Sequence, residues 1–330
     1  MTPRPAPDPA ILPSLDAVRA AADGLRTFLP PSRVVRSDAL SDVLGVDVFF
    51  KLELENPTGS FKVRGAYTVL AGLSPTERAR GVVASSAGNH GLGVAYAAKA
   101  FDTPATLYVP RTAPDVKKAG IRALGTTVND DAADYDAAMV VAKAHAAREG
   151  IRFINPCLGL DLLAGQGTVA LELLEQVPDM ATVVICTGGG GLLGGMGAVL
   201  RALAPRVTIV GAQTVETAAM SRSLSAGVVV DIPVTPTLAD GLSGAIDADA
   251  LHIGQVCADQ MAVVTEAELG ETMAWLWRTT GWSVEGAGAV TVAALRHGYL
   301  KAPAGPLVAL VSGRNVDASR LEAQRVRFPG

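Results

Sequence analysis

The sequence predicts an α/β fold with two open, mostly parallel sheets. Short runs of apolar and β-branched residues alternate with longer stretches rich in Ala and Leu, which is typical of parallel strands covered by helices on both faces. The chain has 330 residues, of which 49% are hydrophobic and 18% are charged, so roughly two domains with a sizeable core are expected. Low complexity is confined to a Pro-rich start of about 13 residues.

Seven runs are predicted as strands because they are apolar and rich in β-branched residues. They are Val46–Phe50, Gly81–Ala84, Thr106–Val109, Thr126–Asn129, Thr182–Cys186, Thr208–Gln213 and Leu307–Ser312. Helices are predicted between them, including Gly91–Phe101, Pro114–Leu124, Asp134–Arg148 and Thr168–Gln176.

No Gly/Ser linker divides the chain. Residues 78–154 are predicted to hold three strands and three helices, and we expect them to form a small domain inserted in a larger one made of residues 1–77 and 155–330. Open α/β sheets bind ligands at the carboxyl ends of their strands, so a cleft between the two domains is the expected site.

Composition argues against several classes of function. With 28 basic and 32 acidic residues, the formal net charge of −4 gives no general attraction to nucleic acid or to an anionic membrane. Four histidines without metal-ligand spacing argue against a metal site. The odd number of cysteines indicates a reducing compartment; they are Cys157, Cys186 and Cys257.

Neither membrane insertion nor export is expected. The Pro-rich start contains acids and lacks the apolar core of a signal peptide. Met180–Leu200 carries no charge over 21 residues but contains seven glycines, which would leave backbone groups unsatisfied in lipid. This stretch is better interpreted as a buried strand, a glycine loop and a helix.

The glycine run in Cys186–Gly195 is the strongest single motif. Free backbone N–H groups between a strand and a helix N-terminus can bind a phosphate. Gly189, Gly191 and Gly194 formally fit a dinucleotide fingerprint, but the next strand ends in Gln213 and not in an acid. A single phosphate monoester is therefore favoured, and a nicotinamide-dependent oxidoreductase is the rival hypothesis.

Lys62 stands out among only seven lysines. It follows a turn predicted at Asn56–Gly59 and begins a helix predicted over Phe61–Leu70. The helix dipole and the nearby Arg64 are expected to lower its pKa and so favour the free amine, which Schiff-base chemistry requires. The alternative is an ordinary surface lysine; the other six lie among charges, on apparently exposed helix faces or near turns.

Two further clusters follow predicted strands. Ser85–Gly91 brings hydroxyls, an amide and an imidazole to a helix expected to start near Leu92, an arrangement suited to a carboxylate; the alternative is simple capping by Ser86 or Asn89. No proton-transfer role is assigned to His90. At the end of the last strong strand, the Ser312 hydroxyl can point toward the cleft.

Together these elements resemble the fold-type II pyridoxal phosphate enzymes, and within them the serine/threonine dehydratase group. The resemblance extends from about Pro31 to Asp317. Ser60–Ala66 resembles the cofactor-lysine motif, Gly188–Gly191 the phosphate loop, and Ser312 the hydroxyl facing the pyridine nitrogen. The loop motif Ser86–His90 and three more segments also match, namely Ala164–Thr168, Thr237–Gly241 and Val284–Glu285.

The resemblance implies a tryptophan synthase β-like fold, pyridoxal 5'-phosphate as cofactor and a small mobile substrate-binding domain. It implies that Lys62 holds the cofactor and removes the Cα proton, and that Asn89 contacts the phenolic oxygen of the cofactor. The implied cofactor-binding residues are Phe61, Lys62, Asn89, Gly188, Gly189, Gly190, Gly191, Leu192, Glu285 and Ser312. The implied substrate-binding residues are Ser86, Ala87, Gly88, Asn89 and His90.

The implied activity is β-elimination from a β-hydroxy amino acid, L-threonine or L-serine, to a 2-oxo acid and ammonia. Alternative substrates are 3-hydroxyaspartate, a phenylserine or a hydroxyectoine-derived compound, and a non-catalytic binding protein is a further alternative. The expected partner is a small amino acid. A homodimer or homotetramer in the cytoplasm is also implied.

The sequence departs from the group at several positions. Serine racemases carry a serine where Ala87 stands, and carboxylates of their divalent-cation site where Gln213 and Ala219 stand, so neither racemisation nor that metal site is expected. Leu92 replaces a common glutamine and Arg314 a common glycine, which puts the usual threonine preference in doubt. Only 15 residues follow Asn315, so no C-terminal regulatory domain is expected.

Overall fold

The computed structural model describes residues 5–300 and 304–330. These residues form a six-stranded sheet in the order β1-β2-β10-β7-β8-β9 and a four-stranded sheet in the order β5-β4-β3-β6. Neighbouring strands are parallel except for β1 and β2. The predicted fold class of two open, mostly parallel sheets is therefore confirmed.

All seven predicted strands form, with shifts of one or two residues at most ends. The strands are β1 (Val34–Arg36), β2 (Val48–Leu52), β3 (Val82–Ser85), β4 (Ala105–Pro110), β5 (Thr127–Ala132), β6 (Arg152–Phe153), β7 (Thr182–Cys186), β8 (Thr208–Thr214), β9 (Gln260–Val264) and β10 (Leu307–Val311). Strands β1, β6 and β9 were not predicted. Two of these are only three and two residues long, so they carry almost no periodic signal. The segment 78–154 accordingly holds four strands instead of three.

The helices alternate with the strands as predicted. They are α1 (Leu15–Leu25), α2 (Asp38–Leu44), α3 (Lys62–Gly72), α4 (Pro75–Arg80), α5 (Asn89–Ala100), α6 (Asp115–Arg122), α7 (Tyr135–Glu149), α8 (Leu160–Gln176), α9 (Gly191–Leu203), α10 (Ala219–Ala226), α11 (Ala248–Cys257), α12 (Glu266–Thr280), α13 (Gly286–Arg296) and α14 (Ala318–Arg327). Three short 3₁₀ helices are η1 (Glu53–Glu55), η2 (Val215–Thr217) and η3 (Asp240–Leu242).

Two helix starts differ from the prediction in ways that affect the site. Helix α8 begins at Leu160, eight residues before the predicted start, because the glycines that weaken its pattern are buried in helix contacts. Helix α5 begins at Asn89, which places Asn89 and His90 in its first turn.

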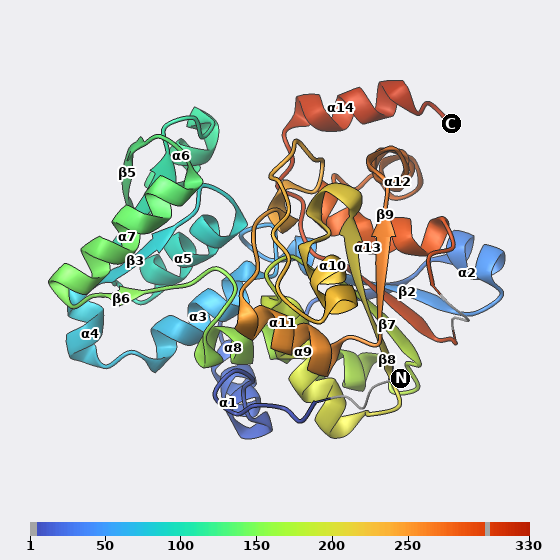
Figure 1. Ribbon diagram of the computed structural model, residues 1–330, viewed down its shortest axis with the longest axis horizontal. Coiled ribbons are helices and arrows are strands. Elements are labelled where there is room, and N and C mark those ends of the chain that lie inside the picture. Colours follow the sequence, from blue (N-terminus) through green and yellow to red (C-terminus); the bar gives the residue numbers. More distant parts are fainter. Residues whose placement is uncertain (1–4, 301–303) are drawn as a thin grey trace.

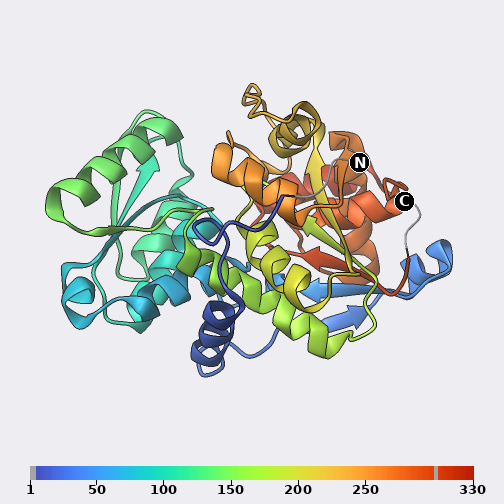
Figure 2. The same ribbon diagram turned by 60° about the horizontal axis from the view of Figure 1, so that its bottom comes forward.

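The two sheets belong to two lobes, and helices α3 and α8 lie between them (Figures 1 and 2). Helix α5 of the smaller lobe packs on α3, which in turn packs on α8. Helix α13 contacts strands β7 to β10 of the larger sheet. The helix that begins with Lys62 is thus held where the lobes meet.

Strand β10 explains why distant residues share one edge. It comes from the end of the chain yet inserts between β2 and β7, parallel to both. The carboxyl ends of these three strands therefore lead into neighbouring loops, which begin at Glu53, Thr187 and Ser312. Such an edge is where open α/β sheets place their ligands.

The core is built from the same strands. Every residue of β7 and β10 is buried, as expected for parallel strands covered on both faces. Within the described ranges, no helix has the length and apolar character needed to cross a membrane.

Candidate active site

Lys62 is the first residue of α3, and its side chain is half-buried. Its Nζ donates a hydrogen bond to the carbonyl of Pro156 at 2.7 Å. The predicted turn before it forms, with Gly59 N–H donating to Asn56 O at 2.7 Å. The amine therefore points to a defined acceptor in a neighbouring loop and not into open solvent.

Glycines bring the neighbouring helices unusually close to the turn that carries Lys62. A Cβ at Gly93 of α5 would lie 3.1 Å from the backbone of Lys62. A Cβ at Gly165 of α8 would lie 2.6 Å from the carbonyl of Arg64, which is closer than real side chains approach. Since packed backbones have little freedom to shift, the position of Lys62 is fixed from both sides.

The loop that accepts from Lys62 also touches the glycine run. Cys157 follows Pro156, and a Cβ at Gly189 would lie 2.8 Å from its Sγ. A Cβ at Gly191 would lie 2.7 Å from the Cys157 carbonyl. The Pro156–Cys157 segment therefore contacts both the amine of Lys62 and the glycine loop.

The glycine loop has the geometry of an anion site. Gly190 has φ +89° and is the N-cap of α9, a helix of 13 residues. Within the described part of the chain, no group accepts a hydrogen bond from the N–H of Gly188, Gly189 or Gly190. Free N–H groups at a helix N-terminus attract a phosphate. Leu192, the next position implied by the resemblance, is buried in the first turn of α9.

The polar side chains that follow β3 do not cap helix α5, although simple capping was the alternative interpretation. Gly88 is the N-cap of α5, and no side chain caps the helix. The Ser86 hydroxyl instead accepts from the N–H of Gly88 at 3.1 Å. Ser86, Ala87, Gly88 and Asn89 are all half-buried, so their polar groups are still partly accessible.

His90 is buried and neutral. Its Nε2 lies 3.1 Å from the carbonyl of Ile154, and since a carbonyl only accepts, Nε2 carries the proton. Nδ1 is then an acceptor, and it has no partner among the described residues. Burial, reinforced by the charge of Lys62, lowers the pKa of His90 to about 3, so the imidazole is not a proton carrier near neutral pH.

The end of β10 meets the residues just before Lys62. Phe61 N–H donates to Ser312 O at 3.2 Å, and Ser60 bridges to Gly313. The Ser312 hydroxyl is buried and donates a long bond of 3.3 Å to Ala287 O. Among the described groups, the buried Ser60 hydroxyl has no partner. Hydroxyls that lack good partners in a buried site indicate room for a polar ligand.

The start of α13 contributes a carboxyl group that contacts Asn89. Glu285 lies just before this helix, is buried, and accepts from Asn89 Nδ2 at 2.6 Å. Burial raises the pKa of Glu285 to about 7, and Asp240 adds to the effect, whereas the bond from Asn89 opposes it. The structure therefore joins Asn89 and Glu285 across 196 residues of sequence.

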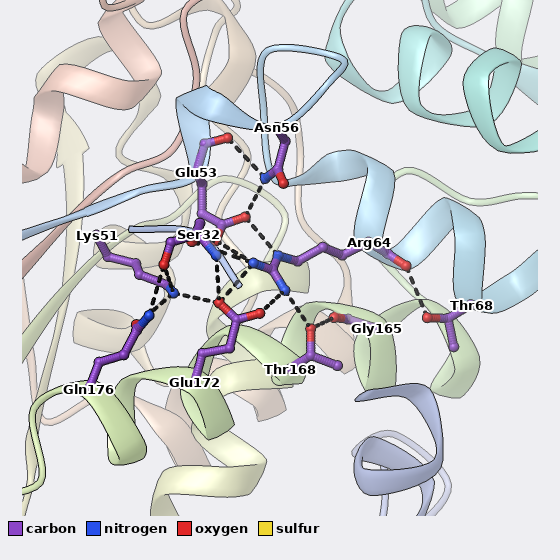
Figure 3. Close-up of polar contacts among 10 residues, drawn as sticks. All are labelled: Ser32, Lys51, Glu53, Asn56, Arg64, Thr68, Gly165, Thr168, Glu172 and Gln176. Carbon is purple, nitrogen blue, oxygen red and sulfur yellow. Dashed lines mark hydrogen bonds and ion pairs between the residues drawn. The ribbon is translucent and has the colours of Figure 1, made fainter. Parts of the chain in front are cut away.

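A buried ion cluster lies behind the Lys62 turn, and the sequence analysis did not find it (Figure 3). We use this name for Lys51, Glu53, Arg64 and Glu172. Arg64 Nε donates to Glu53 at 2.8 Å and Arg64 Nη1 donates to Glu172 at 2.6 Å. Lys51 Nζ lies 2.5 Å from Glu172. The charges of the two cations and the two carboxylates sum to zero, so the cluster has no net charge.

The pKa values in this cluster reflect its pairing. Burial alone would raise the pKa of Glu53, but Arg64 and Lys51 outweigh it and lower the value to about 2. Burial also opposes the charge of Arg64, yet Glu53 and Glu172 raise its pKa. The guanidinium is thus committed to the two carboxylates, and Arg64 acts on Lys62 by anchoring its helix.

The exposure expected for the other lysines was wrong at two positions. Lys51 is fully buried and Lys118 is 6% exposed. Lys51 is accommodated by Glu172, by Gln176 and by the Ser32 carbonyl, and Lys118 by Asp115 and Asp130. The motif Lys-x-Glu on β2 was the available signal, but the acid that pairs with Lys51 lies 121 residues away.

The positions that depart from the family pattern lie in different places. Gln213 is fully buried, donates to Thr217 O at 2.7 Å and accepts from Ser221 N–H at 2.9 Å. Leu92 packs against the core from α5, whereas Arg314 is exposed. No group of three or more His, Cys, Asp or Glu among the described residues is arranged to hold a metal ion.

This set of groups fits a phosphorylated aldehyde cofactor. The glycine loop supplies free donors for a phosphate, Lys62 supplies an amine, and buried hydroxyls at Ser60 and Ser312 adjoin it. The fold and the site therefore define an enzyme that binds a phosphate-bearing carbonyl cofactor beside a lysine.

A family model described as "Pyridoxal-phosphate dependent enzyme" matches residues 25–313, and the chain belongs to this family. The L-threonine ammonia-lyase of Thermotoga maritima is 36% identical over 310 residues, covering 94% of this chain and 77% of the relative. Maize serine racemase superposes with a TM-score of 0.90 at 29% identity, over 96% of this chain and 98% of that one.

A threonine deaminase from Solanum lycopersicum superposes with a TM-score of 0.86 at 29% identity, over 98% of this chain and 93% of that one. The family and the pyridoxal phosphate cofactor expected from the sequence are confirmed. The relatives named here include both a lyase and a racemase, so the reaction has to be argued from the site.

Proposed function

We propose that this enzyme catalyses β-elimination from a β-hydroxy amino acid, L-threonine or L-serine, releasing a 2-oxo acid and ammonia. Relatives and structural neighbours named as threonine ammonia-lyase or threonine deaminase support the proposal. The observation that carries it is the Lys62 amine, bonded to the Pro156 carbonyl in the loop that packs on the glycine run and close enough to His90 of α5 for its charge to act there.

The residues have distinct parts in this proposal. Gly188–Gly191 and Leu192 would hold the cofactor phosphate, Ser312 would supply a hydroxyl to its ring nitrogen, and Phe61 and Glu285 would line its site. The bound cofactor supplies an electron sink conjugated to the substrate Cα. Lys62 would hold the cofactor through its Nζ, and its free amine would accept the Cα proton of the substrate.

The substrate carboxylate binds at the start of α5. Ser86, Ala87 and Gly88 contribute hydroxyl and N–H groups there, and the N-terminus of the 12-residue helix attracts a negative charge. Neutral His90 supports this loop without taking a proton. Loss of water from the substrate and later uptake of water by the released enamine balance, so the net products are the 2-oxo acid and ammonia.

Elimination is favoured over racemisation by Ala87. Racemisation needs an acid–base group on each face of Cα, and the methyl side chain of Ala87 cannot carry a proton. A D-serine assay beside the ammonia assay measures this directly. We expect ammonia release from L-serine with no accumulation of D-serine.

A Lys62→Ala variant tests the proposal. We expect it to lose turnover and to lose the covalent label that borohydride reduction leaves in the wild-type protein, because the Lys62 amine is bonded to the segment that packs on the glycine loop. Peptide mass mapping locates the label, and Lys99→Ala, at an exposed position on α5, serves as the control. A label at another residue, or full activity without Lys62, would refute the assignment.

The substrate side chain is the finer part of the proposal. A panel of L-threonine, L-serine, 3-hydroxyaspartate and phenylserine, scored for ammonia and 2-oxo acid, decides between the alternatives. Turnover of only the bulky or acidic members would move the assignment to another β-hydroxy amino acid while leaving the reaction type intact.

The same proposal covers organisation. We assign residues 1–77 and 155–330 to a large cofactor-binding domain and residues 78–154 to a small substrate-binding domain that moves during turnover. A cytoplasmic location is in keeping with three free cysteines, and a homodimer or homotetramer is proposed on the family resemblance alone.

A further inference from the structure

Asn315 has an amide whose orientation the structure determines. Its Nδ2 donates to the backbone carbonyl of Thr58 at 2.8 Å and to Asn89 Oδ1 at 2.7 Å. A backbone carbonyl can only accept, so the nitrogen of Asn315 must face it. Both protons of this amide are then in use.

The hydrogen bond from Asn315 determines the orientation of the Asn89 amide. Its oxygen faces the Asn315 nitrogen, and its nitrogen donates to Glu285 Oε1 at 2.6 Å. Rotating the amide by half a turn would set nitrogen against nitrogen at one end and oxygen against a carboxyl oxygen at the other. The contact of two amide nitrogens disfavours the rotated form in either protonation state of Glu285, and the contact of the amide oxygen with an ionised Glu285 disfavours it further.

Glu285 is a rigid acceptor. Its backbone N–H donates to Gly313 O at 3.2 Å, and its side chain is 7% exposed. The carboxyl group presses on Gly313 so closely that a Cβ there would lie 1.9 Å from Oε1. Within the described residues, no Arg or Lys forms an ion pair with it. Among the described residues, the hydrogen bond that its carboxyl group accepts comes from Asn89.

We propose that Glu285 and Asn315 are positioning residues that together hold the Asn89 amide as a hydrogen-bond donor. We call Asn89, Glu285 and Asn315 the cleft network. The uncommitted N–H of Asn89 is then available to an oxygen that only accepts, such as a deprotonated phenolic oxygen of the cofactor. The inference rests on the proposed function for the identity of this oxygen, but the orientation of the amide does not depend on it.

Three variants of the holoenzyme test the proposal. Glu285→Met keeps the length of the side chain but offers only a weakly accepting thioether, Glu285→Gln keeps an acceptor oxygen, and Asn315→Ala removes the donor. Asn129→Ala, on β5 of the small lobe, is the control. The readouts are the dissociation constant of pyridoxal phosphate and the fraction of bound cofactor that absorbs at long wavelength, the form with an ionised phenolic oxygen.

We expect Glu285→Met and Asn315→Ala each to weaken cofactor binding by about tenfold, the equivalent of one lost hydrogen bond. Both should also lower the long-wavelength fraction. Glu285→Gln should stay within about threefold of wild type, because an amide oxygen still accepts from Asn89. The double variant Glu285→Met with Asn315→Ala should be little worse than either single variant, since both act on one amide.

Wild-type affinity and spectrum in Glu285→Met and Asn315→Ala would overturn the proposal, as would fully multiplicative losses in the double variant. A loss in Glu285→Gln as large as in Glu285→Met would overturn it too, because charge and not acceptor geometry would then matter. If Glu285→Met does not fold by circular dichroism, the half-buried Asn315→Ala carries the test. Failure of the proposed function is distinguishable, since it appears in the wild type as absence of ammonia release.

Discussion

Two polar networks flank the Lys62 turn, and they are built on opposite principles. In the buried ion cluster each charge faces an opposite charge, and Ser32, Thr168, Asn56 and Gln176 satisfy further lone pairs and protons. In the cleft network one buried carboxyl group faces only a neutral amide. Ser60 Oγ and His90 Nδ1 nearby have no partner among the described residues.

This difference indicates different roles for the two networks: the ion cluster supports the fold, and the cleft network serves ligand binding. A buried ion pair that is fully hydrogen-bonded specifies one arrangement of the elements it joins, here β2, α3 and α8. A buried carboxyl group without a counter-charge costs stability, and such groups concentrate at functional sites. The ion cluster therefore fixes where the lysine stands, and the cleft network and its unpaired neighbours are left ready for a ligand.

The largest effect is expected from breaking the ion cluster. Glu53→Gln leaves Lys51 and Arg64 with a single carboxylate in a buried site, which should lower the free energy of unfolding by about 3–5 kcal/mol. Urea denaturation at pH 7 measures it. Glu55→Gln, in the same 3₁₀ helix but paired with Arg33 at the surface, is the matched control and should change little. Equal denaturation midpoints for the two variants would contradict the assigned role of the cluster.

The second effect is a pH dependence of the free energy of unfolding. It comes from two buried groups, His90 and Glu285, whose pKa values are shifted in opposite directions. His90 has a pKa lowered from 6.5 to about 3, so between these values the unfolded chain binds a proton that the folded one refuses, and stability falls as pH falls. Glu285 has a pKa raised from 4.5 to about 7, so the folded chain holds the proton there, and stability rises as pH falls. From pH 4.5 to 6.5 the two contributions cancel.

Replacing either His90 or Glu285 should leave the pH dependence caused by the other group uncompensated. In Glu285→Gln the free energy of unfolding should increase with pH by about 1.4 kcal/mol per unit between pH 4.5 and 6.5. In His90→Asn it should decrease by a similar amount per unit up to about pH 7. Denaturation series on protein freed of cofactor with hydroxylamine measure both slopes relative to wild type. Parallel curves for the two variants would refute the assignment of these pKa values.

The two networks also differ in how far the sequence could predict them. Lys62, the glycine loop and Ser86–His90 were found because each is a contiguous motif between a strand and a helix, and loop chemistry is encoded locally. The ion cluster was missed because its members join segments as far apart as Lys51 and Glu172. Strands β1 and β6 were missed for a related reason, since they are too short to show a period and exist only as partners of longer strands.

The orientation of Asn89 shows the same limit at finer scale. The family resemblance implies that this amide contacts the cofactor, but which end of the amide is free to do so depends on Asn315, which lies 226 residues away. Helix α5 starting at Asn89 and not near Leu92 is part of the same correction. A motif predicts which groups are present, and the packing of distant segments decides how they are presented.

Gln213 is a third buried polar group for comparison. It is neutral and hydrogen-bonded at both ends of its amide, and its replacement is expected to change the free energy of unfolding least. Its amide donates to a carbonyl at one end and accepts from an N–H at the other, so Gln213→Leu should lower the free energy of unfolding by only about 1–2 kcal/mol. Gln213→Glu should cost more although it is closer in shape, because a carboxylate oxygen would face Thr217 O. Urea denaturation ranks the two, and the long-wavelength absorbance of bound cofactor should be unchanged in Gln213→Leu. The reverse ranking would mean that this site tolerates charge, and that satisfaction of hydrogen bonds is not what distinguishes it from the cleft.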